Sequence, residues 1–126
     1  MDKIHGIVSK GMGEGAFFMS MPHYKKELKK ALGFESYPGT LNIITNQDWK
    51  AMLRNKKELP IAGYEKDGKI LGSASCYLAR FMEIDGAIII PKFNKHKNNV
   101  VEFIAPFHIK TKTGIKDGDE ADLWLK

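Results

Sequence analysis

Short apolar segments separated by turn residues fill most of this sequence, and their number constrains the fold more than any other feature. They are bounded by glycine, proline or Asp-Gly pairs, as β-strands commonly are. The segments predicted to be strands are 3–9, 16–19, 39–44, 59–66, 69–81 with a break near Gly72, 87–91, 100–105 and 121–125. A chain of 126 residues with this many short strands is expected to form a mostly β, small closed barrel, because closure removes exposed strand edges.

Only one or two short helices are predicted beside these strands. Ser20 offers an N-cap, the apolar residues of 24–32 recur with helical spacing, and Gly33 marks the end of the first helix. A second short helix is predicted over 48–54, with its cap at or near residues 46–47. The loops at the ends of the barrel are therefore expected to hold the functional site.

Length and composition favour one ordinary soluble domain over residues 1–126. Hydrophobic residues make up 43% and charged residues 28%, and no apolar run is long enough to span a membrane, so we expect a cytoplasmic protein. A monomer or a weak oligomer is expected, although no sequence feature decides between them. Cys76 is the only cysteine and is expected to be a buried, inert thiol. The net charge of +5 fits a phosphate-bearing partner, either a nucleotide or a nucleic acid.

Several well-known catalytic motifs are missing from the sequence. It has no Gly-x-x-x-x-Gly-Lys-Ser/Thr loop and no Gly-x-Gly-x-x-Gly opening a helix, so Walker-type and Rossmann nucleotide sites are not expected. The four histidines lack metal-ligand spacing, and no Gly-x-Ser-x-Gly elbow is present. Zinc and serine hydrolases are therefore disfavoured.

A glycine-rich stretch, Gly11-Met12-Gly13-Glu14-Gly15, is the first candidate for chemistry. Glycine at every second position removes side chains, so that successive backbone N–H groups can close on a phosphate. The same composition also fits the plain tip of a β-hairpin. The stretch alone leaves both interpretations open.

The second candidate is Tyr37-Pro38-Gly39-Thr40-Leu41-Asn42, in which a Pro-Gly turn leads into a strand. Thr40 and Asn42 lie at alternate positions, so a hydroxyl and an amide oxygen are predicted on the same face, about 7 Å apart along the backbone. Mg²⁺ binds oxygen ligands and is often held by few protein groups together with substrate phosphates. A turn with two ordinary hydrogen-bonding side chains is the alternative.

Taken together, five ordered blocks of sequence resemble the archaeal-type CTP-dependent riboflavin kinases. The blocks are 6–9 leading into 11–15, 32–34 before 37–42, 85–91, 102–106 and 116–119. They cover nearly the whole chain apart from its middle, 45–84, which matches poorly. The resemblance implies a six-stranded cradle-loop barrel and a reaction in which CTP phosphorylates the terminal ribityl 5′-hydroxyl of riboflavin, giving FMN and CDP.

The same resemblance implies specific ligand contacts. Mg²⁺, one ion bound with the nucleotide, would be held by Thr40 and Asn42. The nucleotide contacts implied are Gly11, Met12, Gly13, Glu14, Gly15, Ala16, Phe107, His108, Ile109 and Lys110, and the flavin contacts implied are Asn94 and Glu102. No nucleic-acid partner is expected in this interpretation.

The chemistry of phosphoryl transfer fits two of these residues. The reaction needs positioning and charge neutralisation, to which a cation such as Lys110 can contribute. Glu102 is the carboxylate predicted to orient or deprotonate the acceptor hydroxyl. Without the resemblance, Glu102 would be interpreted as a surface strand residue in an ion pair.

A different class of function competes with the kinase. A small basic β-barrel with aromatic residues can bind nucleic acid, with lysines on phosphates and rings for base stacking. Against this, the lysines are scattered along the chain and acidic residues number 15. A flavin-binding module without catalysis is a third possibility, which would leave Thr40 and Asn42 without a role.

Overall fold

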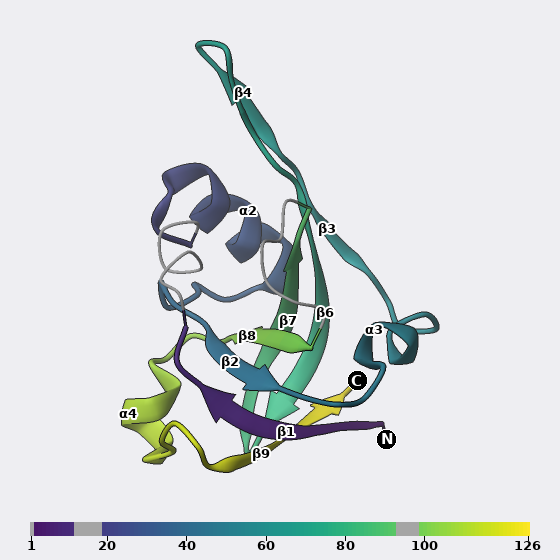
Figure 1. Ribbon diagram of the computed structural model, residues 1–126. Helices are drawn as coiled ribbons and strands as arrows, with labels where there is room; N and C mark the ends of the chain where they lie inside the picture. The colour runs from purple at the N-terminus through teal and green to yellow at the C-terminus, as the bar shows by residue number, and fades with distance from the viewer. Residues whose placement is uncertain (1, 12–18, 93–98) are drawn as a thin grey trace.

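The computed structural model of the chain describes residues 2–11, 19–92 and 99–126 (Figure 1). Six antiparallel strands form a closed barrel in the order β6-β7-β8-β2-β1-β9, and the pairing of β6 with β9 closes the circle. Their bounds are β1 Lys3–Ser9, β2 Leu41–Ile44, β6 Ala74–Phe81, β7 Ile84–Pro91, β8 Val100–Ile104 and β9 Glu120–Leu125. The predicted mostly β, six-stranded closed barrel is confirmed.

Three further strands lie outside the closed barrel. Strand β3 (Leu59–Ile61) pairs with the first residues of β6, and β4 (Tyr64–Lys66) pairs with β5 (Lys69–Leu71) in a separate hairpin. This hairpin projects away from the barrel (Figure 1). The predicted strands 59–66 and 69–81 are thus each divided in two.

The described helices are short and lie around the barrel. Helix α2 (Pro22–Leu32) ends at Gly33, which adopts φ 80° as a left-handed cap, and this confirms the predicted helix and its end. The predicted N-cap is wrong, because the cap residue is Met21 rather than Ser20 and no side chain caps the helix. Helix α3 (Trp49–Met52) confirms the second predicted helix, although its N-cap is Asp48. Helix α4 (Ile109–Thr113) was not predicted. None of the helices in the described segments is long and apolar enough to cross a membrane, and the cytoplasmic location stays a prediction.

One predicted strand is wrong where it can be checked. Of the segment 16–19, only Met19 lies within the described residues, and it is helical rather than extended. Its side chain is buried against helix α2 and the outer face of the barrel. The apolar character of Met19 therefore reflects its burial, and short apolar segments of helix and strand share this signal.

Apolar side chains pack on both faces of the β7–β8 part of the barrel. Inward-facing residues such as Ile88 and Phe103 belong to the barrel interior, whereas Ile89 and Ile104 face outward and pack with Leu28 of α2. This two-sided burial explains the nearly continuous apolar run of β7, because a strand covered on both faces does not alternate. Cys76 lies in the outer cluster, and burial raises its pKa to about 12, which confirms the inert thiol.

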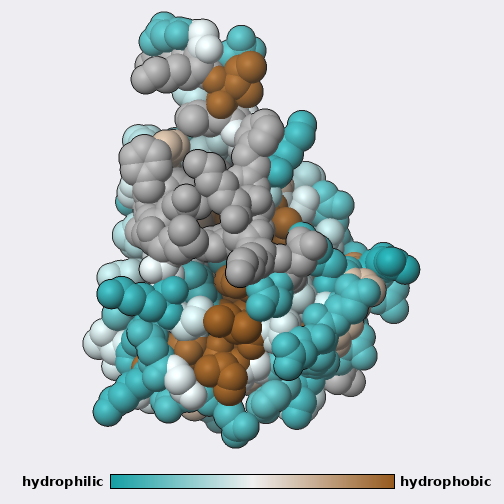
Figure 2. Space-filling model, viewed as in Figure 1, coloured by the Kyte–Doolittle hydropathy of each residue, from teal (hydrophilic) through white to brown (hydrophobic). Residues whose placement is uncertain are grey.

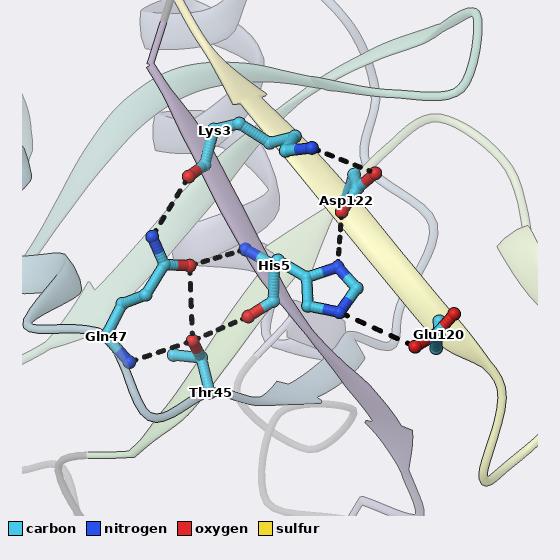
Figure 3. A network of polar contacts seen from close by, with 6 residues as sticks. All are labelled: Lys3, His5, Thr45, Gln47, Glu120 and Asp122. Carbon is cyan, nitrogen blue, oxygen red and sulfur yellow. Dashed lines mark hydrogen bonds and ion pairs between the residues drawn. The ribbon is translucent and has the colours of Figure 1, made fainter.

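Polar side chains complete the edge of β1 where β2 has ended. Residues 3–5 of β1 pair with β9 but not with β2. Gln47 accepts from the His5 backbone N–H at 2.6 Å and donates to the Lys3 carbonyl at 3.2 Å, while the Thr45 hydroxyl donates to the His5 carbonyl at 2.7 Å (Figure 3). These side chains replace the missing strand, so that the backbone groups of β1 stay paired.

Gly86 of β7 packs tightly against β8, and it faces the barrel interior. A Cβ at this position would lie 2.6 Å from Cζ of the Phe103 ring and still closer to the Ile104 carbonyl oxygen. Backbone atoms of a central strand cannot move aside cheaply, so overpacking here is costly.

We therefore expect Gly86→Ala to lower the free energy of unfolding by about 3 kcal/mol. Urea denaturation measures this loss. Gly68→Ala is the control, because Gly68 sits in an open turn at φ 77° with nothing near its absent Cβ, and only about 1 kcal/mol of backbone strain is expected there. Equal losses in the two variants would contradict the steric explanation.

Candidate active site

The site is built on the outer face of the barrel, where β2 lies between β1 and β8. Side chains alternate along β2, so Leu41 and Ile43 point into the core and Asn42 points outward. In the register, Asn42 faces Ser9 of β1 and Glu102 of β8. Directly opposed residues of antiparallel strands share a face. Ser9, Asn42 and Glu102 therefore form one polar row across three strands, which we call the polar row.

The polar row is covered even though it points away from the core. Only 3% of Asn42 and 4% of Glu102 is exposed. The Thr40 hydroxyl, just before β2, donates to Asn42 Oδ1 at 2.7 Å and makes a longer contact of 3.4 Å with Glu102 Oε1. Three oxygen-bearing side chains thus converge at one point, in surroundings that largely exclude water.

Gly11 lies directly over Asn42. A Cβ added to Gly11 would lie 2.9 Å from Asn42 Nδ2. The absence of a side chain therefore lets the backbone approach the polar row closely. Gly11, the first residue of the glycine-rich stretch, therefore lies close to Thr40 and Glu102 as well.

A cleft of about 290 Å³ opens from the polar row toward helix α4. Thr40, Asn42 and Glu102 lie at its floor, and its walls are Gly11, the turn 37–39 and the segment 107–110. A cleft of this size suits a small ligand. Each wall of the cleft comes from a different part of the sequence, so closure of the barrel brings the walls together.

Aromatic and charged side chains line the α4 side of the cleft. The rings of Tyr37 and His108 lie 5.1 Å apart, centroid to centroid, and are tilted by 40°. Lys110 Nζ pairs with Asp117 Oδ1 at 2.5 Å. Tyr37 is 40% exposed, so one part of its ring is available for stacking. This wall combines a partly open ring and a cation, the groups that bind a base and phosphates.

Comparison with known proteins gives the family. Residues 8–124 match the family model CTP-dep_RFKase, whose description reads domain of unknown function DUF120. The match covers the whole cleft wall and the barrel strands, except for most of β1 and the last residue of β9. The chain belongs to the CTP-dependent riboflavin kinase family.

Relatives within this family are similar along nearly the whole chain. The chain is 38% identical to a riboflavin kinase of Pyrobaculum calidifontis over 124 residues, which are 96% of this chain and 58% of that protein. It is 34% identical to the riboflavin kinase of Saccharolobus solfataricus, and the match covers 72% of that protein. It is 36% identical to the riboflavin kinase of Sulfurisphaera tokodaii, and the match covers 92% of that protein. The chain thus spans little more than half of the Pyrobaculum protein and nearly all of the Sulfurisphaera protein.

The structure brings together most of the residues that the family resemblance had implied. The residues that line one cleft are Gly11, Thr40, Asn42, Glu102, Phe107, His108, Ile109 and Lys110. Met12, Gly13, Glu14, Gly15, Ala16 and Asn94 lie outside the described residues. Ile109 is only 5% exposed and packs into the core, so its side chain anchors α4. The burial of Glu102 contradicts its interpretation as a surface strand residue.

Two residues of the site had no role in the sequence analysis. Tyr37 belongs to a matched block, but only the cleft shows that its ring faces His108. Ser9 joins the polar row through the register of β1 with β2, for which one sequence carries no signal. The predicted proximity of the Thr40 and Asn42 oxygens is confirmed, although Thr40 lies just before the strand instead of within it.

The close packing of Gly11 on Asn42 is testable without any ligand. We expect Gly11→Ala to push the Asn42 side chain and to shift its side-chain amide resonances in a ¹H–¹⁵N correlation spectrum, at a stability cost of about 1 kcal/mol. Gly39→Ala is the matched control in the same cleft, because its new methyl would meet the Tyr37 ring at an ordinary 3.4 Å. Unchanged Asn42 resonances in Gly11→Ala would contradict the placement of Gly11.

Proposed function

We propose that this chain is the catalytic domain of a CTP-dependent riboflavin kinase, which transfers the terminal phosphate of Mg-CTP to the ribityl 5′-hydroxyl of riboflavin. The products are FMN and CDP. The observation that carries the proposal is the cleft in which Thr40, Asn42 and Glu102 meet Gly11 and the segment 107–110. Family membership supplies the choice of donor and acceptor.

The nucleotide lies on the α4 side of the polar row in this proposal. Gly11 and the glycine-rich residues that follow it contact the phosphates through backbone N–H groups. Phe107 to Lys110 form the opposite wall, and Tyr37 offers a ring face to the base. Lys110 exchanges Asp117 for a phosphate oxygen when the nucleotide binds, because the ion pair is partly exposed and such pairs are weak.

The residues present fit a magnesium ion. Thr40 Oγ1 and Asn42 Oδ1 are 2.7 Å apart, and neighbouring oxygens around an octahedral Mg²⁺ are about 2.9 Å apart. Among the described residues there is no cluster of three or more His, Cys, Asp or Glu that would bind a metal by itself. Two neutral oxygens therefore suit an ion that arrives with the nucleotide, where it neutralises phosphate charge.

Glu102 acts on the acceptor in this proposal. Its carboxylate accepts a hydrogen bond from the ribityl hydroxyl and takes the proton as the new oxygen–phosphorus bond forms. The bond between the terminal phosphorus and its bridging oxygen breaks, and CDP leaves with that oxygen. The 4% exposure of Glu102 keeps competing water away from the reacting atoms.

Purified protein incubated with riboflavin, Mg²⁺ and each of CTP, ATP, GTP and UTP tests this function directly. FMN formation, followed chromatographically, is expected with CTP alone or preferentially. FMN formation with another nucleotide instead would show that CTP is not the donor, while the protein would still be a riboflavin kinase. If no nucleotide gives product, and oligonucleotides bind in a salt-sensitive way, the nucleic-acid-binding alternative replaces it.

The proposed metal ligands predict a specific dependence on magnesium. Thr40→Ala and Asn42→Ala are each expected to raise the Mg²⁺ concentration needed for half-maximal turnover by at least about tenfold, because even outer-shell groups of a metal site are worth 10–100-fold. Thr40→Ser keeps the hydroxyl and is expected to stay within about threefold of the parent protein. If both alanine variants keep the wild-type dependence on Mg²⁺, Thr40 and Asn42 do not bind the metal.

A further inference from the structure

The turn 116–119 is one of the sequence blocks that resemble the family, but the proposed function gives it no role. The turn connects α4 to β9 and is closed by the Asp119 carboxylate, which accepts from the Lys116 backbone N–H at 2.8 Å. Two hydrogen bonds of 2.8 Å fasten it to the end of β1. The Val8 N–H donates to the Asp119 carbonyl, and the Gly118 N–H donates to the Val8 carbonyl. The backbone of Asp117 is therefore held in place beside β1.

The Asp117 side chain reaches from this turn to Lys110, which lines the cleft. Asp117 Oδ1 lies 2.5 Å from Lys110 Nζ, and Asp117 itself lies outside the cleft lining, behind the cation. The side chains of Lys110 and Asp117 are 34% and 50% exposed. Figure 2 shows hydrophilic residues over α4, which lies at the lower left as in Figure 1. Water reaches this ion pair, so the pair can open and re-form.

The fold does not depend on this ion pair. Ile109 at the start of α4 is 5% exposed and Ile115 just after α4 is 8% exposed, and both pack into the barrel core. These side chains anchor α4, and backbone hydrogen bonds to Val8 anchor the turn. An ion pair between exposed side chains adds only about 0–1 kcal/mol of stability. Asp117 is therefore expected to act on Lys110 rather than on the fold.

A carboxylate at this point opposes nucleotide binding in two ways. It occupies the ammonium whose charge the phosphates need, and it adds a negative charge behind the wall that phosphates approach. A ligand that must wait for a group to be released binds more weakly, in proportion to the fraction of the protein in which that group is free. The affinity for a nucleotide should therefore depend on how firmly Asp117 holds Lys110.

We propose that Asp117 is a positioning residue that competes with the nucleotide phosphates for Lys110. In the empty protein it holds the ammonium at the cleft wall, and after transfer it draws the ammonium back as the product nucleotide leaves. CDP keeps most of the phosphate contacts of CTP, and product release limits turnover in many enzymes. This inference rests on the proposed function and adds the group that limits how tightly the nucleotide is held.

Binding of CDP in the presence of Mg²⁺, measured by isothermal titration calorimetry on the whole chain, tests the competition without catalysis. Asp117→Asn keeps the shape of the side chain and removes its charge. We expect it to tighten CDP binding by about threefold to tenfold, because the exposed ion pair and the repulsion are each weak. In turnover assays the KM for CTP is expected to fall by a similar factor, whereas kcat is not expected to rise.

Two further variants separate this competition from a general effect of charge. In a Lys110→Met background no ammonium is left to compete for, so Asp117→Asn is expected to change CDP affinity by less than about twofold. Asp85→Asn is the matched control, because it removes the same charge from a carboxylate that pairs with Arg80 and Lys126 outside the cleft lining. It is expected to leave CDP affinity within about twofold of the parent protein.

A purely structural role for Asp117 predicts the opposite result. In that case Asp117→Asn would weaken CDP binding and lower the unfolding temperature. Asp117→Ser, a second neutral side chain that is common in turns, guards against a defect peculiar to asparagine.

The outcomes distinguish the inference from the kinase. Unchanged or weaker CDP binding in both Asp117 variants overturns the inference, and so does equal tightening in Asp85→Asn, while FMN formation by the parent protein would still support the kinase. Tighter CDP binding in the Asp117 variants of a protein that forms no FMN would support the inference and reject the kinase. If the parent protein does not bind CDP with Mg²⁺, both are wrong.

Discussion

The pairing of β2 with β1 on one side and β8 on the other is the constraint on which the rest of the site depends. Antiparallel hydrogen bonding fixes which residues are opposite one another, and the pleat fixes which of them point outward. A shift of one residue in either pairing would turn Asn42 into the core and bring Ile43 to the surface. The register thus decides at once where the core and the polar row lie.

Other parts of the barrel maintain that register. Gln47 and Thr45 hold the start of β1 where β2 has ended, and α2 buries the outward residues of β7 and β8 beside Ile104. Along β8, the outward positions therefore pass from Ile104 under α2, through Glu102 in the polar row, to the partly buried Val100. One strand thus supplies both a structural contact with α2 and the buried carboxylate of the candidate site.

The sequence predicted the architecture well and the site in part. Strand lengths, turn residues and the Gly33 stop depend on local chemistry, so the closed barrel and α2 could be expected from the chain alone. The proximity of Thr40 and Asn42 could be predicted because oxygen-bearing side chains at alternate positions are a local signal. Helix α4 was missed because its five residues lack apolar periodicity, and Met19 was misassigned because short apolar segments are ambiguous.

The remaining features depend on contacts between distant parts of the chain. Ser9, Asn42 and Glu102 are brought together by strand pairing, and the exposure of Ile44 follows from what does and does not pack over β2. Neither has a signature in a single sequence. The glycine-rich stretch is intermediate, because its composition suggested phosphate binding, but only the approach of Gly11 to Asn42 places it at the site.

The central claim is that phosphate passes from donor to acceptor at the polar row. A crystal structure of the protein with CDP, Mg²⁺ and FMN tests it most directly. We predict Mg²⁺ on Thr40 and Asn42, the nucleotide between Gly11 and the segment 107–110, and the phosphate end of FMN near Glu102. An FMN phosphate far from Glu102, or a metal bound away from Thr40 and Asn42, would contradict this claim.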